Sequence, residues 1–333
     1  MFTAVSRMSR NRAVQGGAAV LVVLGVLVWW LVPIRESSPS GSVTFSTGVN
    51  RGVYQRYGEL LSPYLDRDLP DVSIKLATSE GSQQNLARVA SGEAQFTIAT
   101  ADAVAKYQKD RDVGYQRLRG CARLYDDYVQ LVVPKGSAVR TTADLRGLRV
   151  GVGQDGSGVR LIADRLLKAA GLDPQRDIKA VPDGIDTMPE SLEHHRLDAF
   201  FWSGGLPTAA VEQLSERFAV RLVPLEPALI SKLHATGESA SHYYRSAEMP
   251  ADAYRDAQDG EAVPTVAVAN LLVTTDQTDP ALAEGFTRTV IDSRDRIGKE
   301  VHPAQLVDLR TAIYTDPLPL HEGAKRYYRS VKP

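Results

Sequence analysis

Short apolar segments alternate with amphipathic helical segments along this chain, and this alternation restricts its fold more than any other feature. In a first block we expect strands at VTFS, VSIKLA and QFTIAT, separated by helices. The first of these helices spaces its apolar side chains close to the i, i+3, i+4, i+7 pattern of a helix with one buried face. Its buried positions would be Val53, Tyr57, Leu60, Leu61 and Tyr64.

A second block begins near Leu148 and repeats the same order of elements. Strands are expected at LRVGV, DIKAV and DAFFWSG, and a helix is expected through PESLEHHRL. Another helix follows the loop GQDGSG, closes at Gly171 as a C-cap, and would bury Val159, Ile162, Ala163, Leu166, Leu167 and Ala170. Repeated strand–helix–strand units build parallel sheets covered by helices, so the chain is predicted to be an α/β protein.

Two further strand-rich stretches fall between and after these blocks, at residues 128–133 and 265–275. If both cross from one block to the other, they form a two-stranded hinge. We therefore expect two lobes with a cleft between them. The first lobe would comprise residues 43–127 and 276–333, and the second residues 128–275.

The N-terminal region contains a long uncharged segment at residues 13–34. A helix of this length rises about 33 Å, which is enough for a hydrocarbon core of about 30 Å. Arginines precede it at positions 7, 10 and 12, which orients the N-terminus inside and the bulk of the chain outside. We expect residues 1–12 in the cytoplasm, an uncleaved transmembrane anchor at 13–34 and a flexible tether at 35–42. A cleaved signal peptide is the alternative, although no A-x-A site follows.

Composition excludes several classes of function. The 39 Lys and Arg residues balance 40 Asp and Glu residues, so the chain lacks the basic field that a nucleic-acid-binding protein needs. The single cysteine, Cys121, excludes an internal disulfide and a Cys-based zinc site. We expect it to be a small buried side chain on or beside a strand.

The titratable side chains form no recognisable catalytic or metal-binding pattern. His194 and His195 are neighbours on an expected helix and point about 100° apart, so we expect both on the surface and no metal site. Asp126 and Asp127 are neighbours on an extended segment and would face opposite sides, which favours the surface at the mouth of the hinge. No serine lies in a G-x-S-x-G nucleophile motif. We therefore expect no catalysis.

The loop GVGQDGSG matches G-x-G-x-x-G through Gly151, Gly153 and Gly156, as dinucleotide-binding loops do. Such a fold also needs an acidic residue about 20 residues later that binds ribose. The candidate, Asp173, lies in an expected turn, and nicotinamide cofactors are not supplied outside the cell. No cofactor is therefore expected.

A glycine-rich loop at a helix start presents free N–H groups and the positive end of the helix dipole, which suits a small anion such as a carboxylate. Ser157 would add a hydroxyl donor there, or serve only as the N-cap of its own helix. The loop STGVNRG at residues 46–52 holds the corresponding place in the other lobe. Two helix starts facing each other across the cleft would clamp a small anionic or zwitterionic ligand.

Six segments, taken in order, resemble a known family. They are FSTG…GVYQRYGELL, SEGSQQNLARVASGEAQFTIATAD, VVPKGSAVRTTADLRGLRVGVGQDGSG, LDAFFWSGGLP, VPTVAVANLLVT and PLPLHEGAKRYY. Together they resemble the TAXI proteins, the extracytoplasmic solute receptors associated with TRAP transporters.

This resemblance implies a bilobed, type II-like periplasmic-binding-protein fold with a two-stranded hinge. The receptor would capture a small carboxylate such as glutamate, glutamine or 2-oxoglutarate and deliver it to a TRAP-type membrane permease. It would work as a monomer without a cofactor. A sensing domain for a membrane sensor kinase is the alternative, and an enzyme on the same fold is a more distant one.

Position by position, the resemblance also implies which residues contact the ligand. The first lobe would contribute Thr47, Gly48, Tyr54, Ser82, Asn85, Thr100, Ala101 and Asp102. The second lobe would contribute Ser157, Gly158, Val159, Trp202, Ser203, Gly204 and Gly205. Ser82 serves equally well as an N-cap, and Trp202 equally well as part of the lobe core.

The first loop departs from the family pattern, which is almost all glycine and threonine, because Arg51 stands in it. Its guanidinium would either grip a second carboxylate bidentately or point to solvent. If it faces the cleft, a diacid becomes the better candidate for the ligand.

Overall fold

The computed structural model describes residues 38–301, 304–305 and 307–331. The predicted cytoplasmic segment and the anchor at residues 13–34 lie outside these ranges. Within them, no helix has the length and the apolar character that a membrane crossing requires.

The described strands form one mixed sheet, whose main path runs in the order β2-β1-β3-β10-β4-β7-β5-β6. Two short strands extend it, since β8 pairs with β4 and β9 pairs with β10. The strands are β1 (Gly41–Ser46), β2 (Val72–Ala77), β3 (Phe96–Thr100), β4 (Leu118–Pro134), β5 (Arg149–Gly151), β6 (Lys179–Val181), β7 (Ala199–Gly204), β8 (Val220–Leu222), β9 (Tyr244–Met249) and β10 (Val263–Thr275). The predicted α/β class is confirmed.

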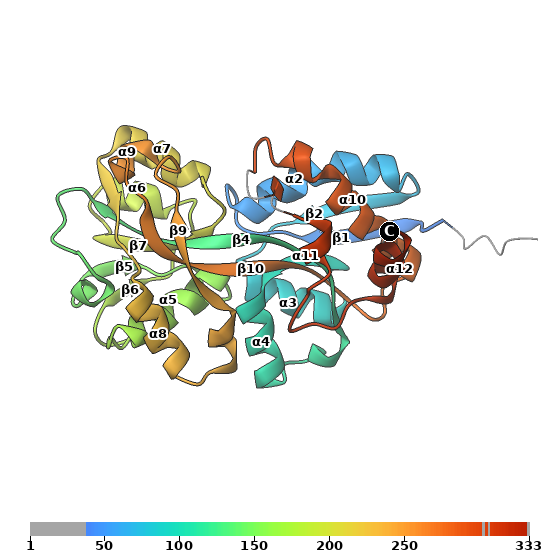
Figure 1. The fold of residues 1–333 in the computed structure, drawn as a ribbon, viewed down its shortest axis with the longest axis horizontal. Coiled ribbons are helices and arrows are strands. Elements are labelled where there is room, and N and C mark those ends of the chain that lie inside the picture. Colours follow the sequence, from blue (N-terminus) through green and yellow to red (C-terminus); the bar gives the residue numbers. More distant parts are fainter. Residues whose placement is uncertain (1–37, 302–303, 306, 332–333) are drawn as a thin grey trace, which may run out of the picture. The chain divides into compact units, whose positions relative to one another are not determined.

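Helices cover both faces of this sheet (Figure 1). The α-helices are α2 (Val53–Asp68), α3 (Ser82–Ser91), α4 (Ala101–Asp110), α5 (Gly158–Ala169), α6 (Met188–Glu193), α7 (Ala209–Arg217), α8 (Pro227–Ala235), α9 (Arg255–Gln258), α10 (Pro280–Ile297), α11 (Leu309–Ala312) and α12 (Glu322–Ser330). The 3₁₀ turns are η1 (Tyr115–Arg117), η2 (Thr142–Leu145) and η3 (Ser239–Tyr243).

Strands β4 and β10 run antiparallel to each other through the middle of the sheet (Figure 1). Near its start, β4 pairs with the end of β10, and after Tyr128 it pairs with β7 and β8. On the other edge, β10 pairs with β3 through residues 270–273 and with β9 through residues 263–268. Strand β10 therefore pairs with the block β2-β1-β3, strand β4 pairs with the block β7-β5-β6, and the two long strands join the blocks by pairing with each other.

The apolar side chains pack into three clusters around these strands. One cluster lies between β1, β3 and helices α2, α10 and α12, and a second involves β3, α3 and α4. The third draws its members from residues 129–268. Cys121 is fully buried in β4 and has no disulfide partner, as predicted. The lobe boundaries at residues 127/128 and 275/276 remain our proposal.

Local sequence explains most helix boundaries, and it also explains where our predictions were inaccurate. Helix α2 buries Tyr57 and Leu61 as expected, but its buried face continues to Leu65, while Leu60 and Tyr64 are half-buried. Helix α6 is shorter than predicted and ends at Glu193. The turn that follows places His195 at a φ of 55°, which a helix cannot accommodate. His194 and His195 are exposed, as predicted.

The first strand begins at Gly41, inside the segment that we expected to be a tether. It does so because the whole of β1 pairs in parallel with β2, from Gly41↔Val72 to Ser46↔Ala77.

Candidate functional site

Three helices begin around one pocket. Its lining includes Gly52, Val53 and Tyr54 at the start of α2 and Gly81 and Ser82 at the start of α3. Ser157, Gly158 and Val159 line it at the start of α5. The remaining lining residues are Gly48, Val49, Glu80, Thr100, Asp127, Gly153, Gln154, Gly184, Trp202 and Ser203.

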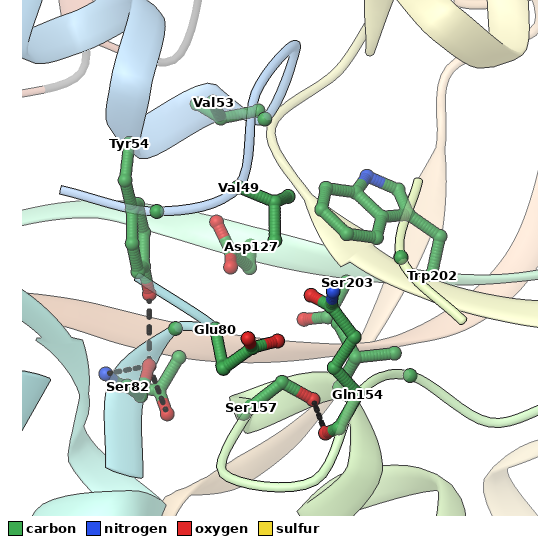
Figure 2. A pocket seen from close by; sticks show the side chains of 18 residues that line it. Val49, Val53, Tyr54, Glu80, Ser82, Asp127, Gln154, Ser157, Trp202 and Ser203 are labelled. Carbon is green, nitrogen blue, oxygen red and sulfur yellow. Dashed lines mark hydrogen bonds between the residues drawn. The ribbon is translucent and has the colours of Figure 1, made fainter. Parts of the chain in front are cut away.

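The pocket is narrow. Its cavity volume is about 50 Å³, and the space between atoms rises to about 550 Å³ when the open mouth is included. Figure 2 shows Tyr54, Ser82 and Asp127 on one side and Trp202, Ser203, Gln154 and Ser157 on the other, all around the same space. A small molecule held here would contact both sides at once.

The start of α5 is arranged as an N-cap. The Ser157 hydroxyl accepts a hydrogen bond from the backbone N–H of Arg160 (3.0 Å) and donates one to the carbonyl of Gln154 (2.6 Å). Gly158 and Val159 occupy the first two helical positions, whose N–H groups have no acceptor within the helix. Two N–H groups and the positive end of the α5 dipole therefore border the pocket.

The start of α3 is capped by the other side of the pocket. The N–H groups of Gln83 and Gln84 both donate to the carbonyl of Gly156, at 3.0 and 3.1 Å. The side-chain amide of Gln83 donates to the carbonyl of Ser157 at 2.8 Å. The loop before α5 thus satisfies donors of α3 only when the two sides are in contact. The contact is close, since a Cβ added to Gly158 would lie 3.0 Å from Ser82 Oγ.

A hydrogen-bonded chain of side chains runs beneath the pocket from α3 to β4. The N–H of Thr100 donates to Ser82 Oγ (3.2 Å), which lies 3.2 Å from the Tyr54 hydroxyl (Figure 2). Tyr54 donates to Asn270 Oδ1 (2.5 Å), and Asn270 Nδ2 donates to Asp127 Oδ1 (2.7 Å). Because Tyr54 has a single proton, the Ser82 hydroxyl must donate to it. Every donor in the chain therefore points toward Asp127.

Asp127 corrects one of our predictions. We expected it at the surface, but it is 3% exposed and lines the pocket from the middle of β4. Burial raises the pKa of its carboxyl to about 7, and the hydrogen bond from Asn270 opposes this increase. Its neighbour Asp126 does face outward, where it forms ion pairs with Arg123 and Arg245.

The pocket is acidic. Besides Asp127, the half-buried Glu80 lines it, and no Lys, Arg or His occurs among the described lining residues. Positive potential comes only from the three helix starts.

A model of one protein family, the NMT1-like family, matches residues 45–331. The chain belongs to the NMT1-like family. Several solved structures are similar to this NMT1-like chain. An ancestral arginine-binding protein bound to arginine is 14% identical with a TM-score of 0.50, covering 78% of this chain and 98% of that one. Identity at this level shows the fold alone, which is the α/β fold of periplasmic-binding-protein-like chains.

Two other similar structures have TM-scores of 0.49. The alkanesulfonate-binding protein SsuA from Xanthomonas axonopodis pv. citri, bound to MOPS, is 16% identical and covers 89% of this chain and 86% of its own. A putative L-cystine ABC transporter from Listeria monocytogenes is 14% identical and covers 79% and 97%.

The structure brings together nine of the expected contact residues of this NMT1-like chain. Gly48, Tyr54, Ser82, Thr100, Ser157, Gly158, Val159, Trp202 and Ser203 all line the pocket. Ser82 is the first residue of α3, and the N-cap position belongs to Gly81. Trp202 has two roles, since it lines the pocket and also packs in the core while its indole N–H donates to Thr208 Oγ1 (3.0 Å).

Seven expected residues lie outside the pocket lining: Thr47, Arg51, Asn85, Ala101, Asp102, Gly204 and Gly205. The guanidinium of Arg51 donates to Gln213 Oε1 on α7 (2.7 Å), and both residues line a different surface hollow. The Arg51 side chain is therefore directed toward α7 and does not line the pocket.

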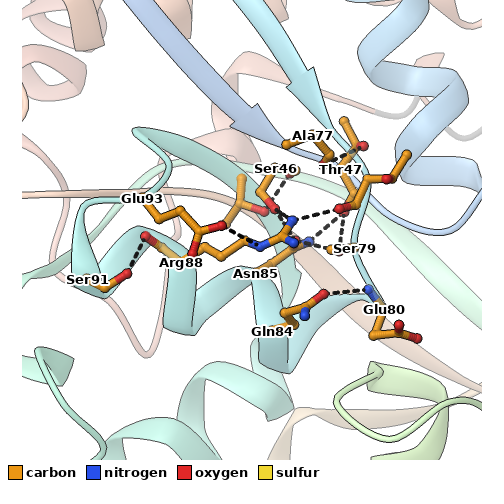
Figure 3. A network of polar contacts seen from close by, with 12 residues as sticks. Ser46, Thr47, Ala77, Ser79, Glu80, Gln84, Asn85, Arg88, Ser91 and Glu93 are labelled. Carbon is orange, nitrogen blue, oxygen red and sulfur yellow. Dashed lines mark hydrogen bonds and ion pairs between the residues drawn. The ribbon is translucent and has the colours of Figure 1, made fainter.

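The side chain of Asn85 is fully hydrogen-bonded to residues on and near β1 and β3 (Figure 3). Its Oδ1 accepts from the hydroxyls of Ser46 and Ser79, both at 2.7 Å, and its Nδ2 donates to the carbonyls of Thr47 (2.6 Å) and Ile98 (2.9 Å). These four bonds use the full capacity of a side-chain amide. Asn85 and Thr47 therefore hold the loops that carry the pocket.

Asp102 forms a buried contact with elements from the other end of the sheet. Its carboxylate accepts from the Tyr244 hydroxyl (2.6 Å) and from Arg165 on α5 (3.1 Å). Asp102 is 2% exposed and Arg165 9%, so this ion pair is shielded from solvent.

Sequence reasoning missed nine lining residues: Val49, Gly52, Val53, Glu80, Gly81, Asp127, Gly153, Gln154 and Gly184. Most of them lie in the two glycine-bearing loops or beside α3, so the signal was present in the pattern. Asp127 had no such signal, because its main partner, Asn270, is 143 residues away.

Proposed function

We propose that this chain is an extracytoplasmic solute-binding receptor that captures a small carboxylate between two lobes. The supporting observation is the convergence of three helix N-termini on one narrow pocket that is lined from both ends of the sheet. Free N–H groups at a helix start, such as those of Gly158 and Val159 on α5, bind carboxylates, and the helix dipole adds to the attraction.

Closure is the proposed mechanism. Contacts such as those from Gln83 to the loop before α5 exist only when the two sides meet. A ligand that touches both sides at once binds the closed form better, and it shifts the population toward closure. The nine expected residues that line the pocket are the proposed contacts, with β4 and β10 as the hinge and residues 128–275 as the second lobe.

The transport role is also a proposal. The six segments that resemble TAXI receptors support a TRAP-type permease as the partner that accepts the loaded, closed form. The uncharged segment at residues 13–34 supports attachment to the outer face of the membrane, with the receptor acting as a monomer.

The test is thermal unfolding of the full chain against amino acids, dicarboxylates, oxo acids and phosphates. A ligand at a hundred times its Kd stabilises the native state by about 2.7 kcal/mol. We expect one small carboxylate to raise the unfolding temperature with the logarithm of its concentration. If no compound on the panel does so, the receptor proposal is wrong.

Ser157→Ala tests the location of the site. Loss of an N-cap costs about 1 kcal/mol, so the empty variant should unfold at a lower temperature. Asp279→Ala, which removes the side-chain cap of α10 (2.9 Å to the N–H of Leu282), is the matched control far from the pocket. Both variants should unfold at a lower temperature, but only Ser157→Ala should also reduce the rise in unfolding temperature that the ligand produces.

A further inference from the structure

The charges around the pocket do not suit a plain carboxylate. Glu80 and ionised Asp127 bring two negative charges, and Glu80 makes no ion pair within the described residues. Each helix N-terminus is equivalent to roughly half a positive charge, so the three together offer roughly +1.5 at most. A ligand with only negative charge would leave the closed pocket strongly negative.

Other charges near Asp127 do not relieve this imbalance. Asp126 is paired with Arg123 and Arg245 outside the pocket, and Asp102 is paired with Arg165. The hydroxyls of Tyr54 and Tyr125 also face Asp127, and burial raises the pKa of both phenols, so neither carries a charge that would affect it. No cation of the described chain offsets the charge of Asp127.

Two polar groups at the same place have capacity for a further donor. Asp127 Oδ1 accepts from Asn270, and the Ser203 hydroxyl lies close enough to the carboxyl to lower the pKa of Asp127. Ser203 is 7% exposed and lines the pocket, and its buried Oγ has no hydrogen bond of good geometry within the described chain. The one proton of Ser203 can serve Asp127, but the Ser203 oxygen and the remaining carboxylate lone pairs stay open to a donor that the pocket receives.

The orientation of the hydrogen-bonded chain identifies what is missing. Its donors all point from Thr100 through Ser82, Tyr54 and Asn270 to Asp127, where the chain ends at an acceptor. The lining therefore needs a donor at this point, and one with a positive charge.

We infer that Asp127 and Ser203 form a subsite that binds an ammonium group of the ligand. Resting on the proposed function, this makes the ligand a zwitterionic amino acid whose carboxylate faces the helix starts. Oxo acids and diacids of the same skeleton are then rejected, because they would supply no donor to either group and would add negative charge to an acidic pocket.

The experiment measures binding by titration calorimetry at pH 8, where Asp127 is ionised. For each of two carbon skeletons it compares the amino acid, the oxo acid that lacks the ammonium group, and the amine that lacks the α-carboxylate. For glutamate the set is glutamate, 2-oxoglutarate and 4-aminobutyrate, and for leucine it is leucine, 4-methyl-2-oxopentanoate and 3-methylbutylamine. The full chain is used. Losing the partner of a buried charge is costly, so we expect at least one amino acid to bind about 30-fold or more tightly than its oxo acid.

Variants then locate the preference. Asp127→Asn should remove most of it, and Ser203→Ala should reduce it about threefold or more while leaving the fold intact. Asp126→Asn, one residue away on β4 and outside the pocket lining, should leave it unchanged.

The outcomes separate the two proposals. An oxo acid that binds as tightly as its amino acid, or a preference that survives both pocket variants, overturns the ammonium subsite but leaves the receptor. 3-Methylbutylamine has no carboxylate, so if it binds as tightly as leucine, the carboxylate site is overturned and the subsite remains. 4-Aminobutyrate keeps one carboxylate, so if it binds as tightly as glutamate, the carboxylate next to the ammonium group is not the one that the site recognises. If no member of either set binds, both proposals fall.

Discussion

The buried carboxyl of Asp127 makes a prediction about stability that needs no ligand. Its pKa is about 7 in the native state against an ordinary value of 3.8, so the native protein holds a proton that the unfolded chain releases. The wild-type free energy of unfolding must therefore fall as the pH rises from about 4 to about 7, and this contribution is constant above that range. A difference of about three pKa units corresponds to about 4 kcal/mol.

Asp127→Asn removes this titration while preserving the shape of the side chain and an oxygen that can accept from Asn270. Relative to wild type, the variant should gain up to about 4 kcal/mol of unfolding free energy between pH 4 and pH 8. Urea-induced unfolding of both proteins across this range, with the difference taken at each pH, isolates the effect from all other carboxyls.

Parallel pH profiles for the two proteins would refute this reasoning, because they would mean that Asp127 titrates alike in the native and unfolded states. Asp126→Asn controls for a general loss of one negative charge. It removes a half-buried carboxylate that pairs with Arg123 and Arg245, and this carboxylate raises the pKa of Asp127 less than burial does.

Two more substitutions test how the two sides of the pocket meet. Gly158→Ala places a methyl carbon 3.0 Å from a hydroxyl of the other side and should weaken ligand binding by about 1–3 kcal/mol, measured by calorimetry. Gly136→Ala, which has open space around the added carbon, should not. Asp102→Asn leaves the buried Arg165 with only its ion pair to the more exposed Glu238, and it should lower the free energy of unfolding by about 3 kcal/mol in urea titrations. Asp155→Asn, which breaks an exposed pair, should change it by less than about 1 kcal/mol.

The order of strands and helices could be predicted from the sequence because local patterns carry it. Strand β2 has the predicted bounds, and the predicted buried face of α2 differs mainly at Leu65. Strand β4 was predicted too short, because its first half carries charged residues such as Arg119 and Arg123 between buried ones. The first half of β4 is a strand because it pairs with β10, which is far away in the sequence.

The pocket was predicted less completely, for a physical reason. A polar residue in a loop has the same local pattern whether it contacts a ligand or its own chain. Asn85 and Asp102 proved to bind their own chain, through partners up to 142 residues away. Asp127 showed the opposite error, because it is buried and accepts from Asn270, a residue of β10 far away in the sequence.

The bonds from α3 to the loop before α5 bear on the proposed closure of the receptor. They join atoms of the chain to one another, so part of the proposed closing free energy does not depend on the solute. Such bonds raise the fraction of empty molecules that are closed, and this raises the apparent affinity for the solute. The same fraction sets a background, because a permease that recognises only the closed shape would also accept empty receptors. Weakening these bonds would therefore sharpen the distinction between loaded and empty molecules at the expense of affinity.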